Sequence, residues 1–369
     1  MNVLMLSWRD PKHPLAGGAE QVMHEHAKGW IQAGHKVTLF SSMFAGGKKE
    51  DELDSVKIIR KGFQLLGVQI CAFFWYIKNK KFDLVIDQFH GIPFFTPLYV
   101  NAPKLAVLQE VAKEVWFLNH LPKPLNWLVG GIGFIIEPFF FVPYKKVPFL
   151  VGSNSAKNDL VTIGINSKHI TVIPHGVITE KIKNFPKEKK ITILFLGALA
   201  RDKGIEDALK TFSILKNKGT FQFWVIGKGS EEYLSFLKKE AKCLEIEEST
   251  TFWGFVSQTK KIELLKKAHI LINPSIREGW GLVNIEANTM GTPVVAYNSP
   301  GLVDSVKHGV SGIICSQNTP TQMAKDVMKV LEEKNYTLFS KNSIIWSENF
   351  SWGKASVSSL KLIERISKT

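Results

Sequence analysis

The chain has 369 residues, of which 45% are hydrophobic and 22% are charged, and its 47 Lys and Arg against 33 Asp and Glu give a formal net charge of +14. This length exceeds the roughly 250–300 residues at which one hydrophobic core stops growing, so two domains are predicted, and the composition excludes a disordered or fibrous protein. The charge calls for an acidic partner, but the lysines are scattered and no nucleic-acid-binding motif is present, which argues against nucleic acid.

In the first half of the chain, short apolar runs alternate with loops and a helical pattern. Such runs of four to eight residues are typical of parallel strands that are covered on both faces. A loop at residues 9–18 leads into a predicted helix at 19–34. The predicted strands lie at 1–8, 35–40, 82–89, 105–110, 148–154 and 170–175.

The segment at residues 125–146 is the best candidate for contact with a membrane. Its uninterrupted apolar core, residues 127–136, is shorter than the ~20 residues that span a bilayer. Glu137, Pro138 and Pro143 then interrupt the run, and aromatic residues lie beside Lys145 and Lys146. Two interpretations stay open at this point: a surface that dips into one leaflet, or a buried core helix.

After a polar, lysine-rich linker at residues 175–190 the alternation of strands and helices begins again. This order predicts parallel sheets with right-handed crossovers, and therefore an α/β protein with two doubly wound, Rossmann-like domains. The expected domains are residues 1–177 and 186–345, with a helix at 346–369 that crosses back to the first domain. The second set of strands is predicted at 191–199, 221–229, 250–256, 269–275 and 292–298.

Three loops at the carboxyl ends of predicted strands carry candidate ligand-binding residues, because ligands of open α/β sheets bind at these ends. Gly17 and Gly18 open the first helix, where backbone N–H groups can approach an anion. Residues 197–204 place Arg201 and Lys203 at a second helix start. In the third loop, residues 277–296, Glu278 and Glu286 flank a glycine-rich turn and a helix that begins near Leu282.

The segment from Glu278 to Glu286 resembles the E-x7-E motif of the retaining GT-B glycosyltransferases of family 4. Further segments resemble the family in the expected order, and together they span nearly the whole chain. They are Gly17-Gly18, residues 174–177, residues 197–204, residues 226–229 and residues 298–312.

This resemblance implies two domains that face each other across a cleft, and a retaining, hexosyl-type transfer from a UDP- or GDP-linked sugar bound there. It implies catalytic roles for Glu278, Lys203 and Glu110, with Glu278 on the hydroxyls of the sugar and Glu286 on the ribose. The acceptor implied is lipid-linked or a surface polysaccharide of the cell envelope. No metal or other cofactor is expected, since the chain has no D-x-D motif. The donor-binding residues implied are Gly17, Gly18, Arg201, Lys203, Gly227, Gly279, Gly281, Leu282, Val283 and Glu286.

The chain departs from the family pattern at two places. Ala198 stands where the family usually has a phosphate-binding arginine, and Gln109-Glu110 stands where relatives often have histidine. An acid does not replace a neutral imidazole donor unless its pKa is raised. A second hypothesis is therefore a nucleotide-sugar-binding subunit that has lost catalysis and acts with a partner enzyme. For His90 and His175 two interpretations stay open: a position lining the cleft, or a structural role only.

Three widely separated cysteines, Cys71, Cys243 and Cys315, fit a reducing compartment and argue against a disulfide framework or a thiolate zinc site. We therefore expect a cytoplasmic protein, with a peripheral position on the inner face of the plasma membrane left open. A nicotinamide-dependent oxidoreductase is disfavoured, because no G-x-G-x-x-G follows the first strand.

Overall fold

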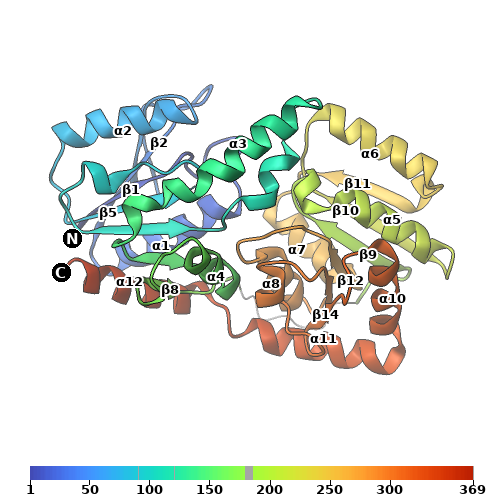
Figure 1. Ribbon diagram of the computed structural model, residues 1–369. Helices are drawn as coiled ribbons and strands as arrows, with labels where there is room; N and C mark the ends of the chain where they lie inside the picture. Colours follow the sequence, from blue (N-terminus) through green and yellow to red (C-terminus); the bar gives the residue numbers. More distant parts are fainter. Residues whose placement is uncertain (90, 120, 179–185, 369) are drawn as a thin grey trace. The chain divides into compact units, whose positions relative to one another are not determined.

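The computed structural model describes residues 1–89, 91–119, 121–178 and 186–368. The chain forms two compact units (Figure 1). The first contains Met1–Gly176 together with Ser351–Thr369, and the second contains Val177–Phe350. The chain therefore leaves the first unit once, builds the second unit, and returns.

The first unit is built on an eight-stranded sheet with the order β3-β4-β2-β1-β5-β6-β7-β8. All neighbouring strands are parallel except β3 and β4, which form an antiparallel pair. The strands are β1 (Asn2–Leu6), β2 (Lys36–Ser41), β3 (Glu50–Leu53), β4 (Val56–Arg60), β5 (Leu84–Phe89), β6 (Lys104–Leu108), β7 (Phe149–Val151) and β8 (Ile170–Val172).

Helices cover both faces of this sheet. One face packs on α1 (Gly18–Gln32) and on the last helix, α12 (Trp352–Ile366). The other face packs on α2 (Leu66–Lys78) and on the end of α3 (Leu125–Phe140), with α4 (Asn154–Thr162) beside them. Four short 3-10 helices complete the unit: η1 (Thr96–Leu98), η2 (Lys113–Leu118), η3 (Val142–Tyr144) and η4 (Ser167–His169).

The C-terminal helix belongs to the first unit because it packs closely on α1. The Trp30 indole N–H donates to Ser359 Oγ at 3.0 Å, and both side chains are fully buried. Gly29 makes this approach possible, since a Cβ at that position would lie 2.5 Å from the Cβ of Ser356. The predicted boundary at residue 346 instead lies inside α11, and the chain re-enters the first unit at Ser351.

The second unit contains a six-stranded, fully parallel sheet with the order β11-β10-β9-β12-β13-β14. Its strands are β9 (Ile191–Leu196), β10 (Phe221–Ile226), β11 (Thr250–Gly254), β12 (Ile270–Asn273), β13 (Val294–Ala296) and β14 (Gly312–Ile314). Its helices are α5 (Ile205–Lys216), α6 (Glu231–Cys243), α7 (Gln258–Lys267), α8 (Leu282–Thr289), α9 (Leu302–Ser305), α10 (Pro320–Leu331) and α11 (Glu333–Ser347), with the 3-10 helices η5 (Arg201–Lys203) and η6 (Glu247–Ser249).

The structure confirms the predicted α/β class with two parallel-sheet domains. It also contains elements that the sequence did not predict, among them β14, α10, the antiparallel β3-β4 hairpin and helix α2. The last two lie in one stretch of the chain. Both follow β2, where the predicted alternation had a gap between residues 40 and 82. The hairpin adds an antiparallel strand at one edge of a sheet that was expected to be parallel throughout.

Candidate functional site

The carboxyl ends of the second sheet bring several loops into direct backbone contact. Gly204 (φ +70°) ends the loop after β9, and a Cβ there would lie 2.2 Å from the carbonyl oxygen of Pro274. Gly301 (φ +78°) follows β13, and a Cβ there would lie 2.0 Å from the carbonyl oxygen of Glu278. Only glycine permits both the positive φ and the close approach. The loops that carry Lys203 and Glu278 are thereby held next to each other.

Lys203 and Glu278 form an ion pair at this edge. The Lys203 ammonium lies 3.0 Å from Glu278 Oε1 and 3.4 Å from Asp202 Oδ2. The Ser275 hydroxyl also donates to Glu278 Oε1, at 3.0 Å. Both members of the pair keep about a fifth of their side chain exposed, so a ligand can reach them.

Helix α8 begins beside this pair, at Leu282 as predicted. Gly281 precedes it in the left-handed conformation (φ +83°), and no side chain caps the helix. The amides of Leu282 and Val283 therefore lie at an uncapped N-terminus, where the helix dipole favours an anion. Beneath this turn the Asn284 side chain is buried between Asn273 and Ser305, with hydrogen bonds of 2.9 Å to each.

Two other predicted donor-binding residues of this unit have acidic or basic partners. Glu286, in the second turn of α8, pairs with Lys261 of α7 at 2.7 Å. Arg201 is largely exposed and lies 3.8 Å from Glu206. Gly227 allows the loop after β10 to approach the loop after β9, because a Cβ there would lie 1.7 Å from the carbonyl oxygen of Gly197.

In the first unit, the predicted glycines open α1 at the end of the β1–α1 loop. The Gly17 N–H donates to Glu20 Oε2 at 2.7 Å, so the buried Glu20 caps the helix from inside. Glu20 Oε1 also lies 3.0 Å from Arg9 Nε, and Arg9 in turn donates to the carbonyl oxygen of Leu15 at 2.7 Å. These contacts place a guanidinium next to the start of α1, where Gly18 begins the helix.

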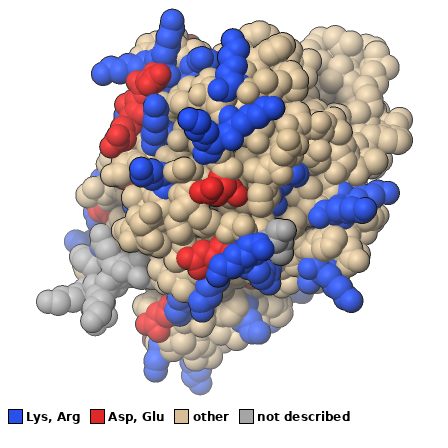
Figure 2. Space-filling view, turned by 90° about the vertical axis from the view of Figure 1, so that its left-hand side faces the viewer, with Lys and Arg blue, Asp and Glu red and all other residues tan. Residues whose placement is uncertain are grey.

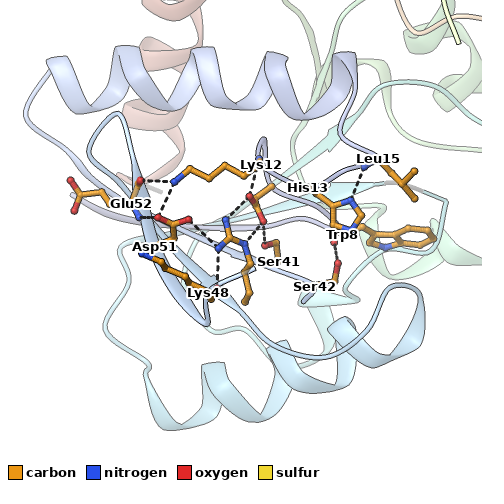
Figure 3. A network of polar contacts seen from close by, with 11 residues as sticks. Trp8, Lys12, His13, Leu15, Ser41, Ser42, Lys48, Asp51 and Glu52 are labelled. Carbon is orange, nitrogen blue, oxygen red and sulfur yellow. Dashed lines mark hydrogen bonds and ion pairs between the residues drawn. The ribbon is translucent and has the colours of Figure 1, made fainter. Parts of the chain in front are cut away.

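A buried ion pair fixes the same loop to the sheet (Figure 3). Both partners are almost fully buried, and the Arg60 guanidinium meets the Asp10 carboxylate with two hydrogen bonds, of 2.7 and 2.8 Å. Burial disfavours the Asp10 carboxylate, but its hydrogen bonds and charge attraction to Arg60 outweigh this effect and lower its pKa. Asp51 and the carbonyl oxygen of Lys48 each accept a hydrogen bond from Arg60 Nη1.

Gln109 and Glu110 line a pocket of about 190 Å³ beyond the end of β6. Ala19 of α1, Glu137 of α3 and six further residues complete the lining. The predicted residue Glu110 and the start of α1 therefore border the same pocket.

His175 orients Gln109 from behind this pocket. The His175 ring is buried, and burial, with a smaller contribution from nearby His26, lowers its pKa to about 3. The ring is therefore neutral, and its Nε2–H donates to Gln109 Oε1 at 2.8 Å. A Cβ at Gly152 would lie 2.5 Å from His175 Nε2, so this glycine makes room for the ring.

The structure thus brings the predicted residues into two groups, one in each unit. Lys203, Glu278 and the start of α8 form the first, and Glu110 with the start of α1 forms the second. The sequence did not reveal the buried support by Arg60 and Glu137. It named His175 as a possible cleft residue but not as the partner of Gln109. Gly152, which follows a strand, was an available signal for the space that this ring needs. His90 lies outside the described residues. Within the described part of the chain, no three His, Cys, Asp or Glu side chains are grouped so as to hold a metal ion.

Two protein-family models match the chain, and together they cover most of it. The model for glycosyl transferases group 1 matches residues 177–345, and the model for glycosyltransferase family 4 matches residues 16–181. The two matches meet near the boundary between the two structural units.

Curated relatives include both uncharacterised and named enzymes. An uncharacterised glycosyltransferase of Methanocaldococcus jannaschii is 30% identical over 238 residues, which are 60% of this chain and 60% of that protein. The human alpha-1,3/1,6-mannosyltransferase is 28% identical over 363 residues, or 86% of this chain and 85% of that protein. The chain thus spans less than two thirds of the archaeal relative but most of the human one.

Solved structures with the same fold extend over the full chain. A sucrose-phosphate synthase from Thermosynechococcus elongatus superimposes with a TM-score of 0.82 at 16% identity and covers 99% of this chain and 98% of its own. The Anabaena protein HepE, in complex with UDP-glucose, superimposes with a TM-score of 0.75 at 15% identity and covers 99% and 100%.

Proposed function

The chain belongs to the glycosyltransferases of group 1 and family 4, and on this premise we propose that it moves a hexose from a nucleotide-diphospho-sugar to a lipid-linked or surface-polysaccharide acceptor. The proposed transfer retains the configuration at the anomeric carbon and needs no metal ion. The bond from this carbon to the diphosphate oxygen breaks, a bond to an acceptor oxygen forms on the same face, and the proton of the acceptor hydroxyl passes to the departing diphosphate.

The observation that carries the proposal is the joint position of Lys203, Glu278 and the start of α8. Negative charge develops on the departing diphosphate, and the proposed stabilisers are the Lys203 ammonium and the amides of Leu282 and Val283. Glu278 accepts hydrogen bonds from the sugar hydroxyls and Glu286 from the ribose. Because about a fifth of each side chain is exposed, a diphosphate can reach Lys203 and replace Glu278 as its partner.

In the first unit, we assign the start of α1 at Gly17 and Gly18 to the donor diphosphate, and Glu110 to the reacting sugar. The pocket that Glu110 shares with the start of α1 supports this assignment. Arg201 and two loops, one at Gly227 and one at Gly279, complete the proposed donor site. The UDP-glucose bound to the Anabaena protein supports a UDP-sugar, and the mannosyltransferase relative supports a hexose. Three free cysteines support a cytoplasmic location.

A panel of nucleotide sugars, with melting temperature and product formation as readouts, tests the proposal. A ligand that binds only the folded chain raises its stability by mass action, so one nucleoside diphosphate is expected to raise the melting temperature, and Lys203→Ala to abolish the shift. Turnover is expected to be unchanged by EDTA, and the product to keep the donor's anomeric configuration by NMR. The absence of both turnover and a shift across the panel would refute the proposal.

A second function is favoured by Ala198 and by Gln109-Glu110 in place of the family's usual residues. The chain would then bind the nucleotide sugar without turnover and act with a partner glycosyltransferase. Tight nucleotide binding with no transfer, followed by transfer after Glu110→His or after addition of the partner, would support this function. Transfer by the unmodified chain alone would exclude it.

A further inference from the structure

Helix α3 buries its polar side and exposes its apolar side. Its buried residues are Asn126, Gly130 and Glu137, which lie on one stripe of the helix. Its other side carries large apolar side chains, of which Trp127, Ile135 and Phe139 are each more than 60% exposed. A helix at a water-facing surface has the opposite arrangement.

The buried stripe is built to fit η2, so the exposure of the apolar side follows from specific packing. The Glu137 carboxylate accepts hydrogen bonds from the N–H groups of Ala112 and Lys113 and from the indole of Trp116, at 2.7, 2.9 and 3.1 Å. Gly130 and Gly133 have no side chains where η2 packs, and a Cβ at Gly133 would lie 2.4 Å from the Trp116 ring. Rotating α3 to hide its apolar side would leave the carboxylate without these donors.

Helix α2, on the same face of the sheet, also exposes large apolar side chains. Unlike α3, this helix buries an apolar side, with Val68, Ala72 and Tyr76 in the core, but it is apolar on its outer side as well: Ile70 and Phe74 are each more than half exposed. Alternate residues of a strand point to one face, and on this face of the first sheet Val85 of β5 packs in the cluster under α2 while Phe89 packs in the cluster beside α3. The two helices (Figure 1) therefore lie over the same face of the first sheet.

Lysines border this apolar surface. Exposed lysines end or follow α2, precede α3 and follow α3 in the sequence, and residues 61–82 contain no Asp or Glu. These lysines are Lys78, Lys80, Lys81, Lys123, Lys145 and Lys146. At the end of α2, a hollow of about 640 Å³ is lined by four lysines, including Lys57, together with Trp75 and Phe82. Figure 2, a view of the first unit, shows Lys and Arg spread widely over one of its sides.

We infer that α2 and α3 form a lipid-binding surface that lies flat in the headgroup and upper acyl region of an anionic bilayer. Apolar helix sides enter the leaflet, and the bordering lysines meet lipid phosphates. The stretch Leu125–Tyr144 is, within the described residues, the one helical stretch long and apolar enough to span a membrane by length and composition. Spanning would place Glu137 and its η2 donors inside the hydrocarbon, which is costly, so a flat orientation is favoured.

This surface goes beyond the proposed function, and it narrows the acceptor to a lipid-linked one, a step that does rest on that function. Lipid binding itself requires neither a nucleotide nor turnover. The chain can therefore fail to bind lipid while the transfer proposal stands, and it can bind lipid even if it transfers no sugar.

Flotation of the full chain with vesicles of phosphatidylcholine, with and without 40% phosphatidylglycerol, tests the inference. The chain is expected to float with the anionic vesicles and at least tenfold less with the neutral ones. The variant Ile135→Glu/Phe139→Glu is expected to lose at least tenfold of this binding without a change in melting temperature. The matched control Leu338→Glu/Val357→Glu alters two other exposed apolar residues, outside α2 and α3, and is expected to bind as the unmodified chain does.

Two further measurements test whether α3 enters the bilayer and whether lipid binding is independent of donor binding. Lipids with brominated acyl chains are expected to quench part of the tryptophan fluorescence, and Trp127→Phe to remove most of that quenching. Lys203→Ala is expected to float normally, which separates lipid binding from donor binding. The inference is overturned if the chain does not float with anionic vesicles, if the α3 variant floats as the control does, or if that variant only converts a dimer into a monomer.

Discussion

Lys203 and Glu278 belong to loops that lie 75 residues apart in the sequence, yet their charged atoms are 3.0 Å apart. We predict that Lys203→Ala and Glu278→Ala each lower turnover by about 10²–10³, the usual effect of removing one preorganised stabilising group. Steady-state kinetics with the donor identified by the panel measures this. Lys239→Ala, on the exposed side of α6, provides the control, and a rate near that of the unmodified enzyme in either site variant would place the donor elsewhere.

A second prediction concerns Lys187, whose ammonium donates to the Thr292 hydroxyl and to the Ala268 and Met290 carbonyl oxygens at 2.8–3.4 Å. Burial lowers its pKa to about 7. Between pH 7 and about 10.4 the unfolded chain then binds more protons than the folded chain, so this residue makes stability rise with pH. From pH 7 to 9 we expect an increase of about 2 kcal/mol in the free energy of unfolding.

Urea unfolding of the unmodified chain and of Lys187→Met is measured at pH 7 and pH 9. The contribution of Lys187 is the difference between the two proteins in how much the free energy of unfolding changes with pH. Lys239→Met serves as the exposed control and is expected to keep the pH dependence. The same pH dependence of stability in the unmodified chain and in Lys187→Met would show that Lys187 does not cause it.

At the residue scale, the sequence predicted where a helix begins better than which side chains meet. Glycines next to an apolar helical pattern were enough to predict the start of α8 near Leu282. The pairing of Glu286 with Lys261, and of His175 with Gln109, depends on how distant segments pack, and no local pattern encodes it.

At the scale of elements, the β1–α1 loop depends on the Asp10–Arg60 pair. Arg60→Met leaves the Asp10 carboxylate buried without its cation, and we predict a loss of about 3–5 kcal/mol in the free energy of unfolding. The double variant Asp10→Asn/Arg60→Met is expected to recover part of this loss, because it removes the buried charge. Lys57→Met, an exposed change on the same strand, is the control in urea unfolding and is expected to have little effect. A loss of stability in Arg60→Met no larger than in this control would contradict the prediction.

The elements that the sequence failed to predict have identifiable physical reasons. Residues 65–77 are almost uniformly apolar, so no 3.6-residue contrast marked α2 as a helix. The β3-β4 hairpin contains the charged segment EDEL and turns at Asp54 and Ser55, both with positive φ, so it lacked the usual strand signals. For α3, the sequence left a leaflet surface and a core helix open, because the choice depends on which side packs against η2.

At the scale of the whole molecule, α12 supplies part of the core of the first unit although it comes last in the sequence. Leu362 and Ile363 are buried in the cluster that includes Val3 and Trp30. We predict that Leu362→Ala lowers the free energy of unfolding by about 2–5 kcal/mol, the range for a large-to-small core change. Val357→Ala, on the exposed side of the same helix, is expected to cost less than about 0.5 kcal/mol.

Urea unfolding of both α12 variants measures the difference. An effect of Leu362→Ala as small as that of Val357→Ala would show that α12 does not contribute to the core in solution.

The return of the chain to the first unit also constrains the order of biosynthesis. Domains usually fold as they emerge from the ribosome, beginning at the N-terminus. Here residues 177–350 are contiguous and can fold while translation continues, whereas the earlier-made sheet waits for Ser351–Thr369. The half that is translated first is thus completed last, and the side of its sheet that α12 covers stays open until that helix has been made.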